Sequence, residues 1–327
     1  MLNRYSDEQL RLAARLYYVD GLGQTEVARF VKVSQAKVSR LLALARERGI
    51  VRISVAEYEP RDQLLEKRLC ARFKLGAAAV IKTVEGSTGE EARRAVGHFG
   101  APFIASLLPP NSVVAIAGGR TIRELILALP EDKERQLTVI QAMGSIDFTV
   151  GPVDALELGR MLARRSGGFF LTLNTPAFVP DKRTRDSFLA HEQIARLWRR
   201  LQQTDVALVG IGTLEDSAFV DRGVLSAADL QDLKARGAVG EICGRFFDRA
   251  GRECDSPWRD RVLSIDLELV RKIPQVVGIV AGADRSTAIA AAIRGGLVKS
   301  LVVDVPGAQA LLENDAPPAA LKTKSKK

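Results

Sequence analysis

Apolar residues between positions 24 and 45 recur at the spacing of two amphipathic helices with a break at residues 33–34. The first apolar face consists of Val27, Ala28, Phe30 and Val31, and the second of Val38, Leu41, Leu42 and Ala45. Two short helices joined by a tight turn are typical of a helix-turn-helix motif. Ser34 stands directly before the second apolar run, so its hydroxyl can cap that helix. We therefore expect the second helix to begin at about Gln35.

The segments flanking this motif predict a winged helix-turn-helix domain over residues 1–56. Before the motif, apolar residues at helical spacing between positions 10 and 17 predict a first helix that ends at residues 21–23. After it, residues 47–55 indicate a helix end at Gly49 followed by a strand. The alternating apolar residues of this strand are Val51, Ile53 and Val55. Such a strand would form the wing.

Residues 57–75 predict an amphipathic connector helix. Its apolar residues, at helical spacing among many charges, are Leu64, Leu65, Leu69 and Phe73. These side chains need a partner, which is either the next domain or a second subunit, and the pattern leaves both open.

From residue 76 to 315 the pattern changes to short apolar runs that alternate with amphipathic segments. The apolar runs, read as strands, are 77–82, 113–117, 137–141, 169–173, 206–211, 276–280 and 300–304. The predicted helices lie near 88–107, 120–129, 153–166, 184–203, 226–235 and 284–294. Strands without polar alternation are buried on both faces, as in a parallel sheet. The alternation predicts a doubly wound, Rossmann-like α/β domain.

Basic residues are unevenly distributed along the 327-residue chain, whose formal net charge is +9. Residues 1–56 contain ten Lys/Arg and five Asp/Glu, and residues 57–315 contain 34 of each. Residues 316–327 contain four lysines and no acid, and are expected to form a basic disordered tail. A basic excess confined to the helix-turn-helix domain and the tail favours nucleic acid as the partner.

Composition argues against several other classes of protein. With 46% hydrophobic and 27% charged residues, the chain can bury the cores of two or three domains. The first residues contain no apolar leader, and no apolar run approaches 18 residues, so no secretion signal or membrane span is expected. Three cysteines without a CxxC pair and two distant histidines argue against disulfides and zinc. We expect a cytoplasmic protein without metal or cofactor.

The second helix of the motif presents polar side chains suited to reading DNA. Amide and guanidinium groups can form paired hydrogen bonds with base edges, and hydroxyl and ammonium groups can reach phosphates. The candidate DNA-contacting residues are Gln24, Ser34, Gln35, Ala36, Lys37, Ser39 and Arg40. Helical bundles and protein-interaction modules share the pattern, but the wing and the charge favour double-stranded DNA.

Ligands of an open parallel sheet bind where strands end and helices begin. Gly118 and Gly119 follow one predicted strand, and Arg120 and Thr121 open the next helix. Free backbone N–H groups, a guanidinium and a hydroxyl make this segment a candidate phosphate cradle. The alternative is a glycine turn needed only for close packing.

Other strand ends supply candidates for binding a sugar. In the segment 237–248, Glu241 and Arg245 offer an acceptor and a donor, and Gln141 and Asn174 end two strands with amides suited to hydroxyls. Residues 210–212, Gly-Ile-Gly, begin like a dinucleotide fingerprint but lack the third glycine, so an NAD site is not expected.

Several segments, in one order, resemble the SorC-type bacterial transcriptional regulators, the sugar-binding DeoR-like group. The matching segments are GQTEVARFVKVSQAKVSRLLALARERGIVRISV, AGGRTIREL, LNTPAFVP, TDVALVGIGT, GAVGEICGRFFDRAG and VAGADRSTAIAAAIRGGLVKSLVVD. The resemblance implies a winged helix-turn-helix joined to an effector domain with the α/β fold of sugar-phosphate isomerases (NagB/RpiA/CoA-transferase-like). It also implies a homodimer or homotetramer whose operator binding changes with a phosphorylated sugar.

The resemblance also implies site residues, with two departures. The family's phosphate loop falls on residues 118–121 and its pocket on Gln141 and Glu241. Gly23 stands where members often have threonine, and is a slightly weaker helix cap. The loop of residues 282–289 lacks the lysine common in the family, and we expect Arg285 to make the anion contact instead.

Two readings of function therefore compete. The favoured one is a sugar-responsive DNA-binding regulator without enzyme activity. The alternative is a sugar-phosphate isomerase-like enzyme with an appended DNA-binding domain, which needs a base in the pocket. Asp221, Glu241 and Asp248 are available, but none stands in a recognisable catalytic pair.

Overall fold

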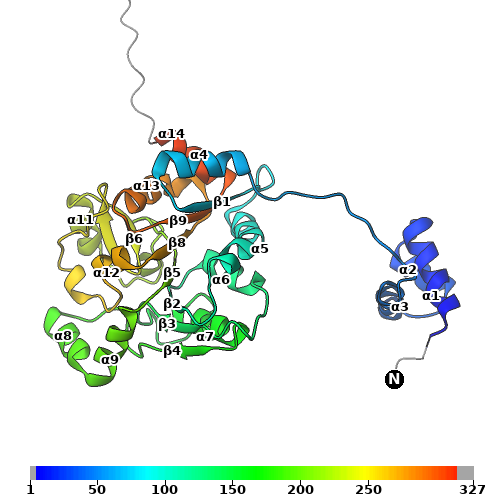
Figure 1. Cartoon of the computed structure of the whole chain (residues 1–327), viewed down its shortest axis with the longest axis horizontal. Coiled ribbons are helices and arrows are strands. Elements are labelled where there is room, and N and C mark those ends of the chain that lie inside the picture. Colours follow the sequence, from blue (N-terminus) through cyan, green and yellow to red (C-terminus); the bar gives the residue numbers. More distant parts are fainter. Residues whose placement is uncertain (1–4, 315–327) are drawn as a thin grey trace, which may run out of the picture. The chain divides into compact units, whose positions relative to one another are not determined.

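The computed structural model describes residues 5–314, and this part of the chain divides after Tyr58 into two compact units. The first unit contains α1 (Asp7–Ala14), the π-helical turn η1 (Arg15–Val19), α2 (Gln24–Phe30) and α3 (Gln35–Glu47) (Figure 1). Their apolar faces share a core made of Leu10, Ala13, Ala14, Val27, Ala28, Val38, Leu41, Leu42 and Ala45. The two short helices that the sequence predicts are present, and the second begins at Gln35 as expected, where the Ser34 hydroxyl accepts the Lys37 amide at 3.4 Å.

The predicted wing is wrong. After α3 ends at Glu47, residues 48–60 form no strand, and the side chains of Ile53 and Val55 are 57% and 81% exposed. A strand requires a neighbour for its backbone N–H and C=O groups. The described residues of the first unit contain only helices and connecting chain, so alternation alone does not produce a strand here.

The second unit is built around a seven-stranded parallel sheet with the order β1-β9-β8-β5-β2-β3-β4. All seven predicted strands are confirmed as β1 (Ala77–Ile81), β2 (Val113–Ile116), β3 (Thr138–Gln141), β4 (Phe169–Leu171), β5 (Val206–Val209), β8 (Gln275–Ile279) and β9 (Ser300–Asp304). The inner strands are buried along almost their whole length. This burial accounts for their unalternated apolar sequences.

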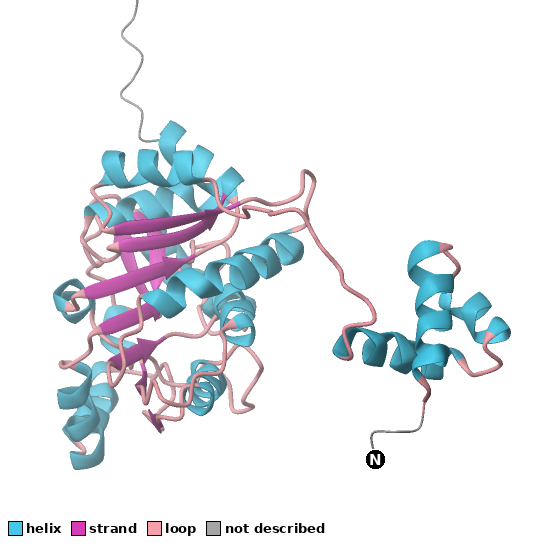
Figure 2. Cartoon of the chain, turned by 45° about the vertical axis from the view of Figure 1, so that its right-hand side comes forward, coloured by secondary structure: helices cyan, strands magenta, loops and turns pink. Residues whose placement is uncertain are grey.

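Helices cover both faces of the sheet (Figure 2). On one face, α5 (Gly89–Ser106), α6 (Arg120–Ala128) and α7 (Ala155–Arg165) pack in succession. The other described helices are α8 (Lys182–Ala190), α9 (Glu192–Leu201), α10 (Ala218–Asp221), α11 (Ala227–Ala235), α12 (Leu267–Lys272), α13 (Ser286–Arg294) and α14 (Val305–Asn314), with the 3-10 turns η2 (Arg259–Arg261) and η3 (Ala283–Arg285). The single helix predicted over 184–203 is two helices, because His191 is extended (ψ 128°).

A hairpin that the sequence pattern did not predict packs against α13. It consists of β6 (Ala238–Ile242) and β7 (Arg245–Asp248). Cys243 and Gly244 connect the strands with φ angles of 53° and 76°, which is the turn geometry that matches the twist of a two-residue hairpin.

The connector helix α4 (Gln63–Phe73) packs on the second unit. Leu65 and Leu69 are buried in the core beside β1, whereas Leu64 is 69% exposed. The sequence left open whether this helix packs on the next domain or on a second subunit, and the structure shows it packed on the next domain. Within residues 5–314, no helix is long and apolar enough to cross a bilayer. The predicted tail at 316–327 lies outside the described residues.

Candidate functional site

A cavity of about 350 Å³ opens at the carboxyl edge of the sheet. Its walls follow the ends of β2, β3, β5 and β8. The chain runs from β2 outward to β3 and β4 in one direction, and from β5 to β8 and β9 in the other. The cavity thus lies at the point where the strand order reverses, which is where doubly wound sheets bind ligands.

The β2–α6 turn lines one side of the cavity. Gly118 lies so close to the start of α7 that a Cβ there would be 2.7 Å from the Val153 carbonyl oxygen, and Gly119 has a φ of 142°. Both glycines are therefore needed for the fold itself. The turn also aims the first N–H groups of α6, which have no partner within the helix, at the cavity.

Four arginines line the cavity, and three of them, Arg93, Arg120 and Arg285, lie close enough to affect one another's charge. Arg120 Nη2 is 2.6 Å from Asp216 Oδ1, and Arg285 contacts the other Asp216 oxygen. Arg93, on α5, is half-buried and has no hydrogen bond or ion pair with the rest of residues 5–314. Burial, followed by the charges of Arg120 and Arg93, lowers the pKa of Arg285, and burial and Arg120 lower the pKa of Arg93. The guanidinium groups of Arg93, Arg120 and Arg285 therefore repel one another.

Glu241 supplies an acceptor at another wall. Its carboxylate accepts hydrogen bonds from the Gly244 amide at 2.6 Å and the Ser217 hydroxyl at 3.3 Å. Burial raises the pKa of Glu241. A Cβ on Gly212 would be only 2.9 Å from Glu241 Oε2, so the glycine at 212 lets the backbone pass beside this carboxylate.

Six of the eight effector-binding candidates from the sequence line the cavity: Gly118, Gly119, Arg120, Thr121, Glu241 and Arg285. The other two lie elsewhere. Gln141 is 1% exposed and its side-chain oxygen accepts the Leu173 amide at 3.0 Å. Asn174 is exposed, with a φ of 49°.

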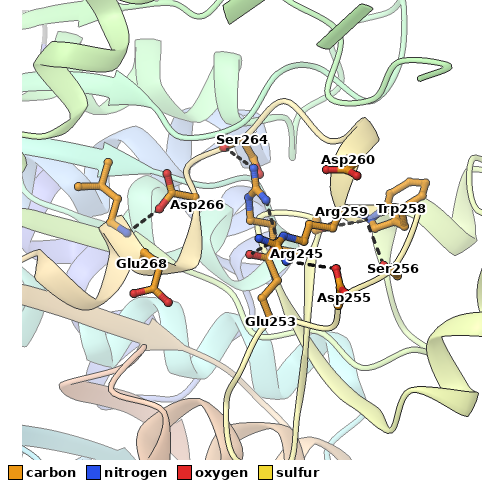
Figure 3. A network of polar contacts seen from close by, with 12 residues as sticks. Arg245, Glu253, Asp255, Ser256, Trp258, Arg259, Asp260, Ser264, Asp266 and Glu268 are labelled. Carbon is orange, nitrogen blue, oxygen red and sulfur yellow. Dashed lines mark hydrogen bonds and ion pairs between the residues drawn. The ribbon is translucent and has the colours of Figure 1, made fainter. Parts of the chain in front are cut away.

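The interpretation of Arg245 as a sugar-binding donor is wrong. Its buried guanidinium pairs with Glu253 at 2.8 Å and donates to the carbonyl oxygens of Ile265 and Ser264 (Figure 3). The hairpin register places Arg245 opposite Ile242 and Glu241 opposite Phe246. Because opposed residues share a face, Arg245 lies on the face away from Glu241.

The structure adds cavity residues that no local signal indicated. Arg93 lies on the helix after β1, and β1 is separated from β2 by three other strands. Asp216 follows a turn that resembled only an incomplete dinucleotide fingerprint. Cys243 also lines the cavity, and burial raises the pKa of its thiol to about 12, so it remains protonated at neutral pH.

The candidate DNA-contacting residues cluster at the start of α3. Ser34, Gln35, Ala36, Lys37, Ser39 and Arg40 are exposed, and Gln24, the first residue of α2, is half-buried. The apolar residues that alternate with them along α3, Val38, Leu41 and Leu42, face the core. The helix therefore presents one continuous polar face.

A family model for a sugar-binding domain (Sugar-bind) matches residues 60–313. The sorbitol operon regulator of Klebsiella pneumoniae is 29% identical over 311 residues, which cover 92% of this chain and 96% of that protein. The deoxyribonucleoside regulator of Bacillus subtilis (strain 168) is 26% identical over 306 residues, with coverage of 92% and 96%. The crystal structure of the full-length Klebsiella regulator, SorC, has a TM-score of 0.75 and 28% identity, covering 95% of this chain and 100% of that chain. The chain therefore belongs to the family of sugar-binding, SorC-type transcriptional regulators.

Proposed function

We propose that the protein is a DNA-binding regulator whose affinity for its operator changes when a phosphorylated sugar or polyol binds in the cavity. One observation carries the ligand class: three guanidinium groups that repel one another lie near a helix N-terminus, and a carboxylate acceptor lies at another wall of the same cavity. A sugar phosphate carries both complementary features, an anionic end and hydroxyl donors.

The phosphate end of the ligand is assigned by charge. Arg93, Arg120 and Arg285 bring three positive charges, Asp216 pairs with Arg120 and Arg285, and Asp284 also pairs with Arg285. A phosphate group, which carries about −1.5 to −2 at neutral pH, could replace Asp216 as the partner of these guanidinium groups. Guanidinium groups and the backbone N–H groups at the start of α6 also match its oxygen acceptors in geometry.

The sugar end is assigned to Glu241, since its carboxyl oxygens accept hydrogen bonds and a sugar hydroxyl donates them. Met143 and Ile146 add apolar contact along the same cavity. The alternative of an isomerase-like enzyme gains no support here. Of its three candidate bases, Asp248 hydrogen-bonds Arg252 and does not line the cavity, and Asp221 and Glu241 form no ion pair within the described residues.

The DNA-binding face is assigned to α3 and the first residue of α2. Its exposed amide, hydroxyl and guanidinium groups include Gln35, Ser39 and Arg40. One helix-turn-helix unit covers few base pairs, and paired half-sites read by a symmetric dimer are the usual solution. We therefore also propose a homodimer or homotetramer as the DNA-binding form.

A binding screen tests the ligand class. The full chain is screened by thermal unfolding against free and phosphorylated sugars and polyols, because a ligand specific for the folded state raises Tm. A phosphorylated compound found in this way should change the operator affinity in a gel-shift titration. Shifts produced only by unphosphorylated compounds would remove the phosphate from the proposal.

The Arg120→Ala variant locates the site. It should lose the effector response and keep operator binding, because Arg120 lies in the cavity and not on α3. Arg123→Ala is the matched control, since Arg123 is on the same helix, pairs with Glu124 and does not line the cavity. Unchanged effector binding in Arg120→Ala would contradict the phosphate assignment.

A further inference from the structure

Asp216 is placed where an anionic ligand of the cavity would have to sit. One of its oxygens contacts Arg120 at 2.6 Å, and the other contacts Arg285. Its side chain is only 29% exposed. The carboxylate thus takes up donors of two of the four arginines that line the cavity.

Hydrogen bonds hold the segment around Asp216 in place between the arginines and Glu241. The Asp216 amide donates to the Thr213 hydroxyl oxygen at 3.1 Å, and the next residue, Ser217, donates its hydroxyl to Glu241. Two successive residues therefore contact the arginines at one end and the sugar acceptor at the other. A ligand that binds both ends must exchange these contacts for its own.

We propose that Asp216 is the residue that selects the effector's anionic group, acting as a resident carboxylate that a phosphate can displace and a sugar-acid carboxylate cannot. The proposal rests on the phosphate assignment made above. A ligand carboxylate would exchange one carboxylate for another and gain little. A phosphate brings more charge and three acceptor oxygens, enough to engage Arg93 as well as the arginines that Asp216 releases.

Asp216→Asn tests the proposal, because it removes the competing charge with little change in shape. Asp284→Asn is the matched control. Asp284 also pairs with Arg285, at 3.1 Å, but it is 63% exposed and does not line the cavity. The probes are inorganic phosphate and gluconate, titrated into each full-length protein by calorimetry at fixed ionic strength.

Asp216→Asn should bind phosphate at least about tenfold more tightly than the native chain, and should acquire gluconate binding that the native chain lacks. Asp284→Asn should stay within about twofold of the native chain, because its charge is exposed and screened. Equal gains in both variants, or no gain in Asp216→Asn, would overturn the selective role of Asp216.

Arg120→Ala in the same titrations separates this inference from the phosphate assignment. If Arg120→Ala loses phosphate binding and Asp216→Asn gains none, the cradle stands and the role of Asp216 is refuted. If Arg120→Ala binds phosphate as the native chain does, the cradle itself is refuted, and the inference falls with it. Thermal unfolding of each variant confirms that the titrated protein is folded.

Discussion

The turn of residues 210–212 offers a pair of substitutions that separates the fit of the binding site from folding. A Cβ on Gly212 would lie 2.9 Å from Glu241 Oε2 and 3.4 Å from the Asp216 carbonyl oxygen. A Cβ on Gly210 would meet its nearest atoms at 3.9 Å and 4.0 Å. Neither glycine has a left-handed φ, so alanine suits the backbone at both positions. Only Gly212→Ala disturbs the carboxylate.

The size of the effect follows from what holds Glu241. Ordinary van der Waals contact to a Cβ begins at 3.4 Å, so the carboxylate must retreat by about 0.5 Å. It is held by the Gly244 amide at 2.6 Å, and this retreat misaligns that bond or the bond to a ligand hydroxyl. A hydrogen bond to a charged group contributes about 1.5–3 kcal/mol. We therefore expect effector affinity to fall by about 10- to 100-fold.

Folding should be affected much less, because the displaced atom is the end of a flexible side chain. We expect Gly212→Ala to lower Tm by about 2–4 °C, which corresponds to about 1 kcal/mol in a protein of this size. Calorimetric titration with the phosphorylated ligand from the screen gives the affinity, and scanning calorimetry gives Tm. Gly210→Ala should match the native chain in both. Native affinity in Gly212→Ala would refute the role of Glu241 as the sugar acceptor.

Three further predictions address the buried charge, the DNA-reading face and the connector. Burial raises the pKa of Glu241 in the folded protein. Ionisation of Glu241 therefore lowers the stability of the folded state at a pH above this raised pKa, and the loss disappears below the ordinary glutamate pKa of about 4.3, where the group is protonated in both states. Glu241→Gln should therefore raise Tm relative to the native chain at pH 8 but not at pH 4, and a shift of equal size at both would contradict this. Arg40→Ala should weaken operator binding by about 1–3 kcal/mol and relax the preference for one base, as measured by fluorescence anisotropy with a set of operator variants. Arg46→Ala, further along the same helix, is the control and should weaken binding equally for all operator variants. The same equal weakening in Arg40→Ala would mean that Arg40 contacts a phosphate and not a base. Leu69→Ala should cost about 2–5 kcal/mol in denaturant unfolding, whereas Leu64→Ala should stay within about 0.5 kcal/mol, and similar losses would mean that α4 is not anchored as described.

The sequence pattern predicts those parts of the fold that depend on local burial. Runs such as residues 113–117 and 300–304 identify parallel strands because both of their faces are covered. The same reasoning fails for residues 51–55, where the alternation is real but no neighbouring strand exists. It also misses the β6–β7 hairpin, since its turn uses Cys243 before Gly244 in place of the usual Asn-Gly or Asp-Gly pair.

The cavity residues that the sequence predicts lie in short segments that can be recognised by themselves, namely residues 118–121, Glu241 and Arg285. The segment 118–121 has its glycines, guanidinium and hydroxyl side by side in the sequence, and it lines the cavity as expected. Asp216 reaches the same place through the strand order, which brings β5 beside β2, and Arg93 reaches it through the packing of α5 on α6. The sequence around an isolated charged residue on a helix or in a loop does not indicate which strands and helices will be its neighbours.

The strand order also brings the loop that carries Arg285 close to the elements that follow the first unit in the chain. Arg285 lies on η3, and η3 contacts α14. Asp304, 2% exposed at the end of β9, holds this region together by accepting the amides of Gly282 at 3.0 Å and Gly307 at 3.2 Å. In turn α14 packs on α4, the first helix after Tyr58. A ligand can change DNA binding only if it binds two arrangements of the protein with different affinity. Arg285 contacts both Asp216 and the Ala281 carbonyl oxygen. An anion that displaces Asp216 therefore changes the contacts of Arg285 on η3, the turn that packs against α14. We expect the two arrangements of the protein to differ in the positions of η3, α14 and α4.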